Sequence, residues 1–172
     1  GVVKILYLMS VIVGVILLSY LAYISWYLIS ARRSAFRMSV TDQVTGLFNR
    51  SAFEKYLNES EPHTFSHTVC VYIDVNKHGH EAGDKLLQSV AECLRAQFPD
   101  DGLYRIGGDE FVVFSKADAA VCEARMQAVS SALAAQDYSI SYGIAAQETT
   151  EGLSDLVREA DENMLKNKRR YY

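Results

Sequence analysis

The stretch that decides the fold is 103–114, which reads LYRIGGDEFVVF. Residues that favour β-strands stand on both sides of Gly107 and Gly108. Glycine adopts positive φ at no steric cost, so this pair permits a tight turn and leaves the backbone open to close approach by a ligand. We therefore predict a β-hairpin with two carboxylates, Asp109 and Glu110, directly after its glycines.

Strand and helix patterns alternate outward from this hairpin. Val69–Val75 (VCVYIDV) is a run of β-formers long enough for a central strand, and from Glu81 to Phe98 the apolar residues recur on one helical face. The same reasoning predicts helices over 51–57, 118–135 and 153–168, and a strand over 138–145. Because at least one strand pair must be antiparallel, the order predicts an α+β domain.

The N-terminal segment differs from the rest of the chain. Only Lys4 is charged among the first 31 residues, and 5–31 is an uncharged run of 27. As a helix at ~1.5 Å per residue, this run is about 40 Å long and can cross a ~30 Å hydrocarbon core with some tilt. Tyrosines and a tryptophan of the kind found near lipid headgroups lie along it. A buried core helix is the alternative interpretation.

Charge sets the expected orientation and domain limits. Arg32, Arg33 and Arg37 follow the apolar run, so the excess of positive charge predicts that the C-terminal domain is cytoplasmic. We expect a transmembrane helix over 1–31, a linker over 32–41 and a folded domain over 42–172.

The composition of the remaining chain excludes some partners. Ser34–Tyr172 carries 14 basic and 21 acidic residues, a net charge of −7. Such an acidic domain is poorly suited to binding a phosphate backbone, so no nucleic-acid partner is expected. Its three cysteines are too few and too far apart for a disulfide framework or a zinc knuckle.

A further acidic residue lies within the predicted central strand. Asp74 stands near the end of Val69–Val75, where an unpaired charge is out of place. If this strand neighbours the hairpin, Asp74 and Asp109 converge at one edge of the sheet. Converging carboxylates suit Mg²⁺, which works with substrate phosphates. Taken alone, a Gly-Gly-Asp-Glu turn is more often a polar hairpin without such a role.

Five ordered stretches together resemble the GGDEF domain, the diguanylate cyclase family. They are 105–111 (RIGGDEF), 42–50 (DQVTGLFNR), 79–84 (GHEAGD), 141–145 (SYGIA), and Ala160-Asp161 with Lys168. The resemblance extends from Thr41 to Tyr172. It implies a palm-like, mostly antiparallel sheet with flanking helices, similar to nucleotidyl cyclases, and the condensation of two GTP molecules into cyclic di-GMP by two facing subunits of a homodimer.

The resemblance also implies a metal site and its catalytic residues. Asp74, the Val75 carbonyl and Asp109 would hold Mg²⁺ (or Mn²⁺). Asp109 would also help to deprotonate the attacking 3′-hydroxyl, and Glu110 would support the metal site.

The location expected is the cytoplasmic membrane of a bacterium, with membrane lipid around the N-terminal helix.

The implied substrate contacts include a departure from the family. Asp84 would bind the guanine edge, Gly108 would lie against the substrate, and Lys168 would meet the triphosphate. However, about seven residues are missing between Asp74 and Gly79, including the family's guanine-reading Asn. Asn76 is the residue expected to bind substrate in its place. A lost base contact costs roughly 1–3 kcal/mol of binding. The alternative function is therefore a degenerate GGDEF module that binds GTP or a protein partner and signals without turnover.

Overall fold

The computed structural model describes residues 1–59, 67–76, 83–146 and 152–169. The chain forms two compact units, Gly1–Ser39 and Val40–Tyr172.

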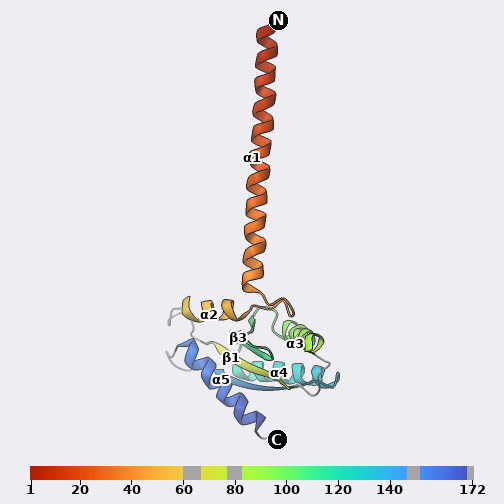
Figure 1. Ribbon diagram of the computed structural model, residues 1–172. Helices are drawn as coiled ribbons and strands as arrows, with labels where there is room; N and C mark the ends of the chain where they lie inside the picture. The colour runs from red at the N-terminus through yellow and green to blue at the C-terminus, as the bar shows by residue number, and fades with distance from the viewer. Residues whose placement is uncertain (60–66, 77–82, 147–151, 170–172) are drawn as a thin grey trace. The chain divides into compact units, whose positions relative to one another are not determined.

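The first unit consists of helix α1 (Val2–Val40) without its last residue, and the helix is drawn in red to orange in Figure 1. Its segment Val2–Ser30 is long and apolar enough to cross a membrane, and none of that segment is buried. The transmembrane helix expected from the sequence stays a prediction, with a buried core helix as its alternative. The residues predicted as a linker continue the helix as far as Val40. The domain limits proposed from the sequence stay predictions.

The second unit is a four-stranded antiparallel sheet with helices on both faces, which confirms the predicted α+β fold. The strands lie in the order β2-β3-β1-β4, and every neighbouring pair is antiparallel. They are β1 (Val69–Asn76), β2 (Gly102–Arg105), β3 (Glu110–Ser115) and β4 (Ser139–Ala146). The helices are α2 (Arg50–Glu59), α3 (Gly83–Gln97), α4 (Ala119–Ala134) and α5 (Leu153–Lys168).

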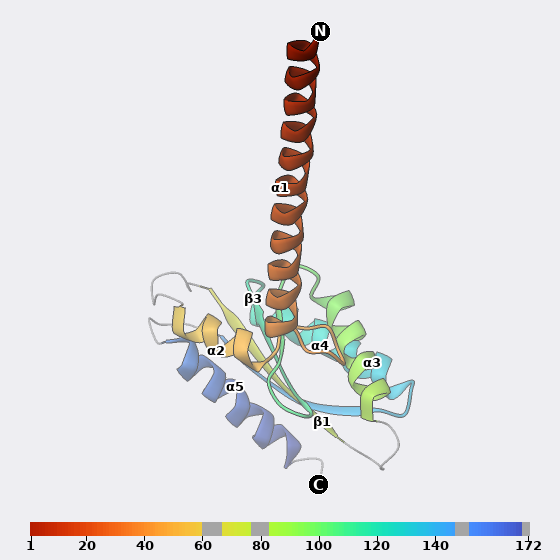
Figure 2. The ribbon, with the colours of Figure 1, turned by 45° about the horizontal axis from the view of Figure 1, so that its top comes forward.

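Alternation along β1 divides the core into two layers. Val71 and Ile73 belong to a cluster with apolar side chains of α3 and α4, whereas Cys70 and Tyr72 belong to a cluster with those of α2 and α5. Figure 2 shows these helix pairs on opposite sides of the sheet. Because side chains alternate along a strand, Asp74 continues the face of Cys70 and Tyr72, toward α5.

The observed elements match the predicted ones to within a few residues at each end. β1 extends to Asn76 because its ladder with β4 continues to the pair Asn76 and Ser139. The helix predicted from Glu81 begins at Gly83, and the two residues before it lie outside the described part of the chain.

Helix α5 lies directly against β4 at Gly143. A Cβ at this position would lie 2.7 Å from the carbonyl carbon of Asn163, and closer still to the backbone nitrogen of Met164 and the backbone oxygen of Ala160. The obstacle is helix backbone, which cannot move aside as a flexible side chain can. The absence of a side chain at Gly143 therefore sets how closely α5 approaches the sheet.

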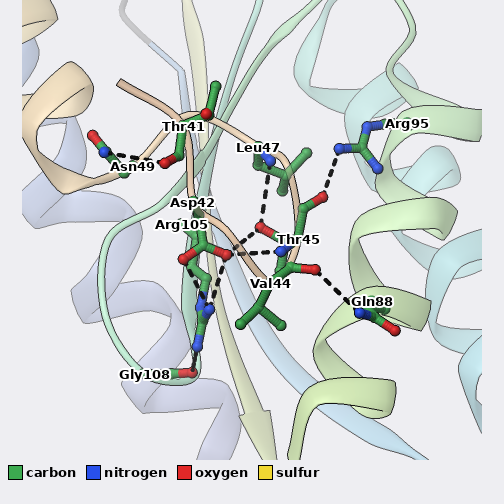
Figure 3. A network of polar contacts seen from close by, with 10 residues as sticks. All are labelled: Thr41, Asp42, Val44, Thr45, Leu47, Asn49, Gln88, Arg95, Arg105 and Gly108. Atoms are coloured by element: carbon green, nitrogen blue, oxygen red, sulfur yellow. Dashed lines mark hydrogen bonds and ion pairs between the residues drawn. The ribbon is translucent and has the colours of Figure 1, made fainter. Parts of the chain in front are cut away.

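The turn before α2 is joined to the hairpin by a polar network (Figure 3). Asp42 Oδ1 accepts hydrogen bonds from the backbone nitrogen of Thr45 (2.8 Å) and from its hydroxyl (2.7 Å). Arg105 donates to both carboxylate oxygens of Asp42, at 2.9 and 3.0 Å, and to the Gly108 carbonyl at 2.8 Å. From α3, Arg95 donates to the Thr45 carbonyl at 2.6 Å. The network therefore fixes the glycine turn against the start of the domain.

The network also changes the acidity of Asp42. Burial raises the pKa of this carboxyl, but hydrogen bonds from Thr45 and Arg105 and the charge of Arg105 lower it, and the net shift is downward. A carboxyl with a lowered pKa in the folded state adds stability above its unfolded pKa, near 4, and loses it as the pH falls through the folded pKa.

We expect Gly143→Ala to lower the free energy of unfolding by about 3 kcal/mol, the upper part of the range for overpacking, because the new methyl group meets α5 backbone. Urea unfolding of the full chain in detergent, followed by near-ultraviolet circular dichroism, measures this. Gly83→Ala is the matched control, because a Cβ at Gly83 meets nothing within 4 Å. Equal stabilities of the two variants would contradict this account of Gly143.

We expect Asp42→Asn to lower the free energy of unfolding by about 2 kcal/mol at pH 7, because hydrogen bonds to a charged group are lost. The variant should also lose less stability than the parent between pH 5 and pH 3, because residue 42 no longer titrates. Asp155→Asn is the control, since Asp155 pairs with Arg158 on the surface and should change stability by no more than about 0.5 kcal/mol. Urea unfolding across this pH range would contradict the expectation if parent and Asp42→Asn curves ran parallel.

Candidate active site

The centre of the candidate site is Asp74, near the end of β1, which lies between β3 and β4 in the sheet. On its two neighbouring strands it pairs with Glu110 of β3 and with Ser141 of β4. Its strand therefore neighbours the hairpin, which was the condition for the expected convergence of Asp74 and Asp109. Its side chain is 17% exposed and forms an ion pair with Nζ of Lys168, near the end of α5. This partner explains how a carboxylate is tolerated in an otherwise apolar strand.

Asp109 lies across the ladder from the residue that follows Asp74. The backbone nitrogen of Val75 donates to the backbone oxygen of Asp109 at 2.9 Å. Since Cα atoms of facing residues in an antiparallel ladder lie about 5 Å apart, the backbones of the two predicted metal-binding segments adjoin. The convergence of the Asp74 and Asp109 carboxylates themselves stays a prediction.

Glu110 has a partner that the sequence analysis did not identify. The hydroxyl of Tyr72 donates to Glu110 Oε1 at 3.0 Å, reaching diagonally from β1 to β3. Burial raises the pKa of Tyr72, as do the hydrogen bond to Glu110 and its charge. The sequence did contain a signal for this contact. Side chains alternate between the two faces of a strand, so Tyr72 lies on the same face as Asp74.

Another carboxylate, that of Asp161 on α5, lies near Asp74 and Glu110. Burial raises the pKa of Asp161, and the negative charges of Glu110, Glu162 and Asp74 raise it further. Sequence reasoning noted Asp161 only as part of a motif. Spacing on the helix gave the signal, because Asp161 follows the buried Ala160 and lies two turns before Lys168.

The oxygen ligands predicted here suit a hard divalent cation whose remaining ligands come from phosphates and water. Among the described residues, no three Asp, Glu, His or Cys side chains are grouped so that they could hold a metal ion by themselves. Mg²⁺ is usually bound through one or two carboxylates plus phosphates and water, so two aspartates and a backbone carbonyl are sufficient from the protein. The oxygen-only set of Asp74, the Val75 carbonyl and Asp109 therefore fits this ion in its chemistry.

The predicted substrate-binding residues occupy different surroundings. Asn76 lies at the end of β1, and its Nδ2 donates to Ser141 Oγ at 3.3 Å. Asp84 is exposed in the first turn of α3, the helix on the face of the sheet opposite α5. Gly108 is exposed at the hairpin tip, and a Cβ there would meet nothing within 4 Å. Gly79 and His80, which carry part of the motif, lie outside the described residues.

Comparison with known proteins gives one family. The family model "Diguanylate cyclase, GGDEF domain" matches residues 39–171. The coiled coil and GGDEF domain of DgcB from Caulobacter crescentus, solved in complex with c-di-GMP, superposes with a TM-score of 0.75 at 22% identity. It covers 88% of this chain and 92% of that one. At this identity the structural likeness supports the fold.

Curated relatives carry different activities in their names. Cyclic di-GMP phosphodiesterase PdeB of Shewanella oneidensis is 42% identical over 78 residues, which are 41% of this chain and 9% of that protein. Diguanylate cyclase DgcS of the same organism is 26% identical over 144 residues, 74% of this chain and 49% of that protein. The chain thus spans less than half the length of these relatives. The match over 39–171, together with the antiparallel sheet and the glycine turn beside β1, establishes that this chain belongs to the GGDEF family.

Proposed function

We propose that the domain is a diguanylate cyclase, which condenses two GTP molecules into cyclic di-GMP with Mg²⁺ (or Mn²⁺) at the interface of a homodimer. The observation that supports this most is the complete Gly-Gly-Asp-Glu-Phe turn held against the end of β1 that carries Asp74. The cyclase DgcS supports the same activity by its similarity.

In this proposal, Asp74, the Val75 carbonyl and Asp109 hold the metal ion. Bound there, the ion would neutralise charge on the triphosphate, as in other phosphoryl transfers. Asp109 also accepts the proton of the attacking 3′-hydroxyl, and Glu110 supports the site from the neighbouring strand position.

Substrate binding involves residues on both sides of the site. Lys168 exchanges its ion pair with Asp74 for the triphosphate, and a lysine is well suited to this because its ammonium is a mobile point charge. Gly108 leaves room for substrate at the hairpin tip. Asp84, with Asn76 in place of the missing family residue, binds the guanine edge.

Helix α1 anchors the domain in the cytoplasmic membrane, among lipid, with the catalytic domain in the cytoplasm. Its length, its apolar exposed surface and the arginines that follow the apolar run support this. Confinement to a bilayer raises the effective concentration of a second copy, which a reaction between two bound GTP molecules requires.

A second candidate function is a module that binds GTP or a protein partner and signals without turnover. Two contacts favour it. The side-chain amide of Asn76 already donates a hydrogen bond to Ser141, although guanine binding would require this amide. Asp74, which would have to bind the metal, is paired with Lys168. In addition, the similar stretch of PdeB belongs to a protein named a phosphodiesterase.

The two functions differ in their product. We expect the full chain in lipid nanodiscs, given Mg²⁺ and GTP, to form cyclic di-GMP, detected by chromatography. Asp109→Ala should reduce the rate by roughly 10²–10³-fold or more, because a group that stabilises the transition state is removed. Asp100→Ala is the control, since Asp100 is exposed in a turn on another part of the chain. GTP binding without any product would reject the cyclase and favour the second candidate.

We expect Lys168→Met to raise the KM for GTP roughly tenfold, because a charged contact to phosphate is lost. In the absence of nucleotide, the same variant should bind Mn²⁺ several-fold more tightly, because Lys168 no longer occupies Asp74 and the metal-competent fraction increases. Initial rates and electron paramagnetic resonance of Mn²⁺ measure the two effects.

The control for this pair of measurements is Lys166→Met, which removes an exposed lysine from the same turn of α5. Its KM and Mn²⁺ affinity should equal those of the parent. Weaker Mn²⁺ binding by Lys168→Met would contradict competition between the lysine and the metal.

A further inference from the structure

The carboxylate of Glu110 is held from two sides. On one side, the Tyr72 hydroxyl donates to Oε1 at 3.0 Å. On the other side, Gly107 makes room for Oε2, because a Cβ at Gly107 would overlap with this oxygen and lie 3.2 Å from Glu110 Cδ. The backbone completes the arrangement, since the Ile106 nitrogen donates to the Glu110 carbonyl at 2.9 Å and closes the turn. The side chain of Glu110 therefore folds back over the first glycine and meets β1.

The hydroxyl of Tyr72 is not required for packing. Tyr72 is 8% exposed and belongs to the apolar cluster that includes Phe53 and Phe114. A phenylalanine would fill the same space, and a buried hydroxyl is costly unless it is hydrogen-bonded. The oxygen that accepts this hydrogen bond belongs to Glu110, whose facing residue on β1 is Asp74.

We propose that Tyr72 is a positioning residue, which together with the bare Cα of Gly107 holds the Glu110 carboxylate beside Asp74 in readiness for the metal and nucleotide. The part of this inference that concerns turnover rests on the proposed cyclase activity. The contact between Tyr72 and Glu110, and its effect on cation binding, do not.

The contact is tested first, without catalysis. The full chain is labelled with tyrosine carrying ¹³C at Cζ and placed in lipid nanodiscs, and the Tyr72 resonance is assigned by its absence in Tyr72→Phe. Glu110→Ala should shift this resonance, because the phenol loses its acceptor, and should leave the Tyr104 resonance in place. A Tyr72 resonance that does not respond to Glu110→Ala would overturn the proposal.

Positioning is tested second, with Mn²⁺ and GTP as probes. Tyr72→Phe should weaken Mn²⁺ binding about three- to tenfold and lower kcat to a similar extent, with the KM for GTP nearly unchanged, because the carboxylate remains but is no longer held. Tyr104→Phe is the matched control, since its ring belongs to the same apolar cluster. Its Mn²⁺ affinity and kcat should stay within about twofold of the parent.

A second variant approaches the same carboxylate from the other side. The methyl group of Gly107→Ala would displace the flexible end of Glu110 rather than backbone, so it should reproduce the loss of Mn²⁺ affinity. Combining it with Tyr72→Phe should add little, because both changes release the same group, whereas separate structural defects would multiply.

The outcomes separate this inference from the proposed function. A parent that binds Mn²⁺ but forms no cyclic di-GMP would reject the cyclase and leave the resonance and Mn²⁺ measurements to decide on Tyr72. An active parent whose kcat and Mn²⁺ affinity are unchanged by Tyr72→Phe would overturn the positioning role alone. If the losses of Mn²⁺ affinity multiplied in the variant that combines Tyr72→Phe with Gly107→Ala, the positioning role would also be overturned.

Discussion

The antiparallel pairing of β1 with β3 is the constraint on which the rest of the domain depends. It places Asp74 opposite Glu110, and the hydrogen bond from Val75 to Asp109 extends the pairing into the glycine turn. A slip of one residue would turn every side chain of β1 to the other face, carrying Asp74 into the apolar layer beneath α3 and α4. The buried valines and Ile73 on that face make such a slip costly, so the core sets the register and the register sets the site.

Charge neutralisation follows from this placement. Two carboxylates near the turn have basic partners, Asp74 with Lys168 and Asp42 with Arg105. The first pair joins α5 to the central strand, and the second joins the start of the domain to the hairpin. Removing one member of a partly buried pair would leave an uncompensated charge, which is costly. Each pair therefore stabilises the contact between the two elements that it joins.

Much of the fold could be predicted from residue patterns, because its signals are local. β-Formers marked β1, apolar periodicity marked α3 and α5, and two glycines marked the hairpin. Asp74 stood out because a charge within an apolar strand requires a partner. The strand order depends on contacts between distant residues and was not predicted. The family resemblance implied only a mostly antiparallel sheet with flanking helices. Tyr72 was missed because tyrosine is common in strands and gives no local signal. Its hydrogen bond to Glu110 joins residues 38 positions apart in the sequence.

The seating of α5 on Gly143 has a mechanical consequence for the site. Helix backbone rests on strand backbone there, with no compressible side chain between them. A sliding movement of α5 would force the Ala160 oxygen and the Met164 nitrogen over the strand, so this helix resists displacement along its axis. The wall of the site that carries Asp161 and Lys168 is therefore stiff. Under the proposed function, adjustment to the nucleotide would then fall to side-chain rotation, above all that of the long Lys168, rather than to movement of the helix.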